Sequence, residues 1–164
     1  MNPPLADHRS LARWAADCAR RVLPLFEEAC PRDDRPRKAV EAARAWARSD
    51  IGYAAVRAAA LAAHAAAREI DQPAARAAAR AAGHAAATGH AATHSRAAGT
   101  SALAAVSAAA AARERAWQVR HLPKRLRPIA LPDETPGRKA LQAHTGATRS
   151  SVPGTIRRRT SSRK

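Results

Sequence analysis

Alanine dominates this chain, supplying 48 of its 164 residues, often in runs of three or more. The larger apolar residues Leu, Ile, Val and Phe number only 21, or 13%, which is below the level of about 20% expected of a folded chain. Alanine is nevertheless the strongest helix former, because its side chain loses no rotamer entropy in a helix. We therefore predict an all-α fold: a compact bundle of about five to six alanine-rich helices whose backbones approach closely.

Prolines, glycines and the spacing of the larger apolar residues predict the helix boundaries. Pro24 should end or kink the first helix near Arg21, because proline removes an amide donor. A break beyond the fourth helix should fall near either Thr88–Gly89 or Gly99–Thr100, since glycine weakens a helix interior. The first predicted helix spans 5–23, the second begins at Pro36, and the third runs from a cap at Ser49 or Asp50 to about Ile70. The fourth begins near Pro73, the fifth runs from Ser101 to about Arg120, and a short helix or turn follows Pro123.

The formal charge of +16 is unevenly distributed. From Thr135 onward there are eight basic residues and no acid, so about a fifth of the chain carries half of the charge. Beyond Pro132 no apolar periodicity remains, which predicts a helical domain over 5–131 and a disordered basic tail over 132–164. Such a tail could bind nucleic acid non-specifically by neutralising phosphates. The residues for this alternative are Arg157, Arg158, Arg159, Arg163 and Lys164.

The residue pattern does not support catalysis. Cys18 and Cys30 fall on apolar or turn segments, without the histidine and orienting group that a nucleophilic thiol requires. The few acids lie mostly at helix ends or in ion pairs, so no pair of carboxylates suggests acid–base chemistry. We predict that the chain is not an enzyme, uses no cofactor and keeps both cysteines reduced.

Two of the histidines have a spacing that metal sites use. His90 and His94 are four residues apart, a spacing that can place two imidazoles on one ion. On a continuous helix, however, His84 would lie about 120° from His90 and about 80° from His94, so the three would not converge. No acid occurs between Asp71 and Glu114 to complete a ligand set. The sequence therefore predicts no metal site.

Arginines and histidines recur at helical spacing on the third and fourth helices. We expect the arginines to be solvated and the histidines partly buried, so that the two faces form a basic surface for a protein with an acidic surface. The predicted partner-binding residues are Arg57, His64, Arg68, Arg76, Arg80 and His84. The apolar stripe of the third helix, predicted to face the core, consists of Tyr53, Val56, Ala60, Ala63, Ala67 and Ile70.

The chain has no apolar run of the roughly 18 residues that a membrane span needs. Charged residues at Asp7, Arg9 and Arg13 interrupt the segment where a secretory signal would lie. We therefore expect a soluble, cytoplasmic protein that does not bind membranes. A core built mainly of methyl groups contributes little burial energy, so self-association into a homo-oligomer also remains open.

Three segments, 5–28, 33–69 and 74–99, resemble the immunity-five-like family of immunity proteins from bacterial polymorphic-toxin systems. The most distinctive block is DDRPRKAVEAARAW, from Asp33 to Trp46, and the resemblance extends over about residues 5–131. It implies an all-helical domain that binds and neutralises a cognate toxin without catalysis. The charge of +16 further implies that the target surface is acidic. A nucleic-acid-binding or nucleoid-associated protein that uses the basic tail is the alternative.

Overall fold

The computed structural model describes residues 3–131. Within that range the chain forms helices joined by turns and loops, and it contains no strand. The prediction of an all-α fold is confirmed, with slightly more helices than expected because residues 94–105 form a helix of their own. The elements are α1 (Leu5–Ala29), α2 (Arg35–Arg48), α3 (Tyr53–Arg68), α4 (Pro73–Ala87), α5 (His94–Ala105), α6 (Ala108–His121), the 3₁₀ turn η1 (Lys124–Leu126) and α7 (Arg127–Ala130).

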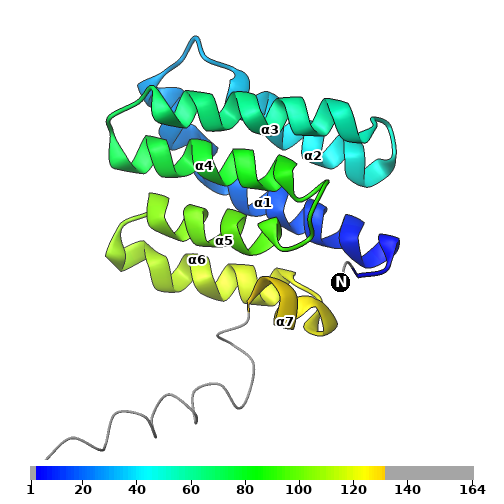
Figure 1. Cartoon of the computed structure of the whole chain (residues 1–164). Helices are drawn as coiled ribbons and strands as arrows, with labels where there is room; N and C mark the ends of the chain where they lie inside the picture. Colours follow the sequence, from blue (N-terminus) through cyan, green and yellow to red (C-terminus); the bar gives the residue numbers. More distant parts are fainter. Residues whose placement is uncertain (1–2, 132–164) are drawn as a thin grey trace, which may run out of the picture.

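Helix α4 lies at the centre of the arrangement, between α3 and α5 (Figure 1). Helix α1 packs against α4, α2 and α5, and α6 and α7 lie beside α5 at the edge away from α3. The long face of α3 that turns away from α2 and α4 has no helix packed over it among residues 3–131. This leaves α3 as an outer helix of the bundle.

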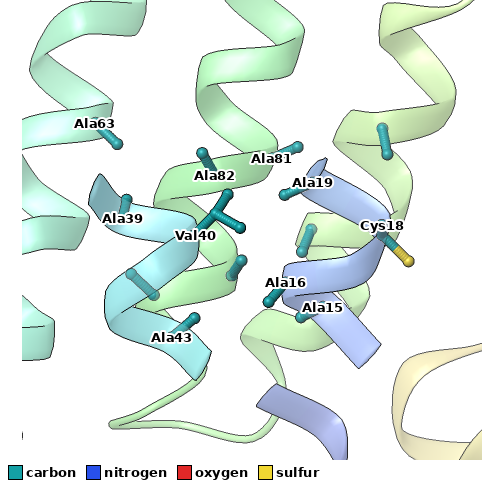
Figure 2. Packing of buried hydrophobic residues seen from close by; sticks show 14 of the residues in the cluster. Ala15, Ala16, Cys18, Ala19, Ala39, Val40, Ala43, Ala63, Ala81 and Ala82 are labelled. Carbon is teal, nitrogen blue, oxygen red and sulfur yellow. The ribbon is translucent and has the colours of Figure 1, made fainter. Parts of the chain in front are cut away.

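The core is built mainly from methyl-sized side chains. Figure 2 shows alanines and Val40 filling the space between α1, α2, α3 and α4. The nine buried residues of α4 are eight alanines and Gly83, so this helix is enclosed on most sides by its neighbours. Bulkier groups such as Leu11, Val22 and Phe26 fill the core along α1, where each is at most 1% exposed. Side chains of this size allow neighbouring helix axes to lie close together.

Helix α1 continues through Pro24 to Ala29, so of the two predicted outcomes, an end or a kink near Arg21, the end is wrong. Proline removes the hydrogen bond that would run to the carbonyl of Arg20. Arg20 and Pro24 are both exposed, so water can hydrate that carbonyl. On the opposite side Val22 and Phe26 are buried, and their packing holds the helix together across the proline.

Arg35 joins the beginning of α2 to the end of α3. Its Nε donates to Asp33 Oδ1 at 2.9 Å, and its Nη1 donates to Glu69 Oε1 at 3.1 Å. These hydrogen bonds favour the charged carboxylates and lower the pKa of both Asp33 and Glu69. Ser49, whose φ of 73° is left-handed, ends α2, so α3 begins at Tyr53 rather than after a cap at Ser49 or Asp50.

The helix predicted from Ser101 to about Arg120 is instead divided between α5 and α6. Extended backbone at Val106 and Ser107 separates them, and serine is favoured at the N-terminal cap that Ser107 occupies. The break lets α6 return to α1, where Trp14 Nε1 donates to the Gln118 carbonyl at 3.0 Å. Arg21 Nε also lies 2.9 Å from Glu114 Oε2.

Gly99 lies inside α5, so the break after α4 is the one predicted near Thr88–Gly89. A Cβ atom at Gly99 would lie 2.8 Å from the Trp14 ring, which shows how closely α5 approaches α1. None of the helices within residues 3–131 has the length and apolar character needed to traverse a lipid bilayer.

Candidate partner-binding surface

One face of α3 carries half of the predicted partner-binding residues. We call it the α3 stripe: Tyr53, Arg57, Leu61, His64 and Arg68. Their spacings of three or four residues place them within an arc of about 80° around the helix axis. As predicted, Arg57 and Arg68 are exposed and His64 is partly buried.

Tyr53 belongs to this stripe and not to the core, contrary to the prediction. Its side chain is 56% exposed, whereas Val56 and the other members of the predicted apolar stripe are buried. Around the helix, Tyr53 lies about 40° from Arg57 and about 60° from Val56. The four-residue steps from Tyr53 to Arg57 and Leu61 were the signal that could have placed the tyrosine on the arginine face.

The predicted residues of α4 differ in their surroundings. Arg80 is exposed, and its charge lowers the pKa of both His64 and His84, after larger contributions from burial and from neighbouring histidines. Arg76 is half-buried and closes the turn between α3 and α4: its Nε donates to the Ile70 carbonyl at 2.8 Å, and its Nη2 donates to Asp71 Oδ1 at 3.2 Å. A contact of Arg76 with a partner stays a prediction.

Four histidines form a continuous series of ring contacts beside α3, which we call the histidine row. The ring centroids of His64 and His84 are 4.7 Å apart, those of His84 and His94 are 5.6 Å apart, and those of His94 and His90 are 4.8 Å apart. The ring of His90 in turn meets the ring of Tyr53 at 6.1 Å. The row therefore runs from His64 to Tyr53 along the α3 stripe.

The row exists because the chain leaves helical geometry between α4 and α5. Helix α4 ends at Ala87, the connection contains His90, and α5 begins at His94. The angles expected for His84, His90 and His94 apply to an uninterrupted helix, so they do not describe these ring contacts. The connecting turn reverses the direction of the chain and brings the three rings together with His64.

Gly83 provides the space for the first ring of the row. A Cβ atom at this position would lie 2.7 Å from Cε1 and Nδ1 of His64, so the ring lies directly on the α4 backbone. The buried Nδ1 atoms of His84 and His90 have no hydrogen-bond partner within residues 3–131. The imidazoles thus pack by their rings, without a network of polar contacts to support a charged form.

Burial and neighbouring histidines lower the pKa of three members of the row, His64, His84 and His94. Desolvation, followed by the neighbouring His64 and His94 and then Arg80, lowers the pKa of His84 to about 4. Desolvation is also the largest cause of the lowered pKa of His64, ahead of His94, Arg68 and Arg80. The pKa of His94 is lowered by desolvation and by His90.

Several other ionisable groups are buried or join helices by ion pairs. Across residues 3–131, no three or more His, Cys, Asp or Glu side chains are placed so that they could hold a metal ion. Cys18 is buried, and desolvation followed by Glu114 raises the pKa of its thiol, which disfavours a nucleophilic thiolate. The carboxylates of Asp17 and Glu114 pair with Arg44 and Arg21 and so join helices.

A groove of about 290 Å³ lies between α1 and α2. Among its lining residues, Glu27 Oε1 lies 2.7 Å from Arg37 Nη2, so this acid is engaged in an ion pair. The basic residues predicted to bind nucleic acid lie outside the described part of the chain. They are Arg157, Arg158, Arg159, Arg163 and Lys164.

Comparison with known proteins identifies the family. Neither the curated proteins nor the solved structures include a significant match to this chain. A family model described as "Imm-5 like putative immunity protein" matches residues 4–125, which are 122 of the 164 residues. The match includes the block from Asp33 to Trp46 and helices α1 to α6. This chain therefore belongs to the Imm-5 like family of immunity proteins.

Proposed function

We propose that this chain neutralises a cognate bacterial toxin by direct binding, without catalysis. The match of the immunity-protein family over residues 4–125 carries the proposal. Two further observations favour binding over chemistry: the carboxylates of Asp17 and Glu114 are paired with arginines of other helices, and burial lowers the pKa of His84. A helical scaffold with an exposed face that carries arginine and tyrosine is suited to recognising another protein.

The partner should present an acidic surface. Between residues 51 and 113 the only acids are Glu69 and Asp71, at the turn between α3 and α4. Glu69 pairs with Arg35 and Asp71 pairs with Arg76, so both negative charges are already compensated. The remaining arginines of this region give the α3 and α4 side of the molecule a positive potential that would steer an acidic partner towards it.

The test is co-expression of the full chain with the toxin encoded beside its gene. We expect the chain to restore growth to cells that make the toxin, and the two proteins to purify as a complex. A form that ends at residue 132 should protect equally well, because the family match lies before that point. Toxicity that is unchanged by the full chain, with no complex formed, would contradict the proposed function.

Binding of nucleic acid by the basic tail is a second candidate, supported by the charge of eight basic residues without an acid from Thr135 onward. Its affinity for duplex DNA should fall steeply with salt and should be lost with residues 133–164. DNA binding that persists in the shortened form would contradict this mechanism. Cytoplasmic location and self-association stay predictions of the sequence.

A further inference from the structure

Large apolar side chains are concentrated on the exposed side of α3. Three such residues remain more than half exposed within the described range: Leu5 at 55%, Tyr53 at 56% and Leu61 at 55%. Two of the three lie on the α3 stripe, eight residues and therefore about two helical turns apart. In a protein whose core has few large apolar groups, leaving a leucine and a tyrosine on one outer face forgoes burial energy that folding could have used.

The same stripe carries positive charge that the fold does not compensate. Arg57 lies between Tyr53 and Leu61, and Arg68 follows Leu61 by seven residues, or about two helical turns. In the part of the chain that the structure describes, neither of these arginines nor Arg80 of α4 forms an ion pair. Tyrosine and arginine are the residue types that most often dominate the binding energy of protein interfaces.

We propose that Tyr53, Arg57 and Leu61 form the centre of the surface on which the toxin docks, with Arg68 and Arg80 at its rim. This inference rests on the proposed function and names the part of the molecule that performs it. The occupant is an acidic protein surface with shallow apolar pockets for Tyr53 and Leu61 and a carboxylate for Arg57. The ring of His90, 6.1 Å from that of Tyr53, supports the tyrosine from the connection between α4 and α5.

A protein fits this surface better than nucleic acid does. The positive charge on the stripe is limited to two arginines, separated by a leucine at 55% exposure that would meet no complementary group on a phosphate backbone. An apolar side chain beside an arginine is instead the composition found at the buried centre of protein interfaces, where water is excluded. Charge complementarity and exposed apolar area therefore point to the same class of partner.

The test compares paired variants of the full chain for binding to the toxin encoded by the neighbouring gene. Leu61→Ala is matched by Leu5→Ala, since both leucines are 55% exposed. Arg57→Glu is matched by Arg120→Glu, an exposed arginine on α6 that carries the same change of charge. All four positions are exposed, so circular dichroism and thermal melting should remain those of the unaltered chain.

We expect Leu61→Ala to weaken toxin binding at least about tenfold and Arg57→Glu about a hundredfold, with the two control variants within about threefold of the unaltered chain. Unaltered toxin binding by both α3 variants would refute the docking surface while leaving the proposed function intact. If the unaltered chain itself does not bind the toxin, both are refuted. A loss of affinity for a short DNA duplex in the α3 variants, with toxin binding retained, would assign the surface to nucleic acid instead.

Discussion

Lowering the pH from about 7 to about 5 should destabilise the fold through the histidine row. In the folded protein, burial and the neighbouring cations hold the pKa of His84 at about 4, against an ordinary value of about 6.5. The unfolded chain therefore takes up a proton near pH 6.5, while the folded ring does not until about pH 4. Between about pH 4 and pH 6.5 the unfolded state therefore binds more protons than the folded state. The contribution of His84 to the free energy of unfolding is fully present above about pH 6.5 and is lost as the pH falls towards 4.

The size of the effect follows from the shift at His84. Each pH unit between the two values removes at most about 1.4 kcal/mol, so an upper limit of about 2 kcal/mol applies from pH 6.5 to 5. Because the ring is only half-buried, solvent screening reduces the expected loss to about 1 kcal/mol. His64 and His94, whose pKa values are also lowered by desolvation, add to it in the same direction.

Urea denaturation followed by far-UV circular dichroism at the two pH values measures this loss. The His84→Gln variant should lose about 1 kcal/mol less than the unaltered chain on acidification, since glutamine does not titrate. The control is His121→Gln: His121 is exposed on α6, stacks on Trp117 and lies outside the histidine row. Equal loss of stability in all three proteins, or no loss in the unaltered chain, would refute the assignment to the row.

Three further predictions concern close contacts in the core. Gly83→Ala should destabilise the protein by about 1–2 kcal/mol in urea denaturation, because its Cβ would lie 2.7 Å from the His64 ring; a gain in stability, as at an ordinary helix position, would show that the ring moves freely. Trp14→Phe should cost about 2 kcal/mol by leaving the Gln118 carbonyl without its donor, and a melting temperature unchanged within error would argue against that bond. Mass spectrometry after iodoacetamide treatment near neutral pH should find Cys30 alkylated and Cys18, with its raised pKa, protected; equal rates would contradict the burial of Cys18.

The local chemistry of the chain was sufficient to predict that it is helical and where several of its helices begin. Alanine runs have one strongly favoured conformation, and the prolines at Pro36 and Pro73 occupy the first turns of α2 and α4, as predicted. Likewise, the spacing of Arg57, His64 and Arg68 alone places them on one face of a helix. These properties depend on neighbours three or four residues away, which the sequence displays directly.

Other features were decided by contacts between distant segments. Helix α1 continues past Pro24 because Val22 and Phe26 are buried on its opposite side. Gly99 lies within α5, where the ring of Trp14 packs against it. The histidine row depends on the turn after Ala87 and on the ring of His64 lying on Gly83, nineteen residues further along the chain. The sequence by itself determined helix type and the faces of single helices, because those depend on backbone propensity and periodicity. Only the tertiary structure decided which faces meet and which histidines come together, because burial and ring contacts depend on how separate helices are arranged in space.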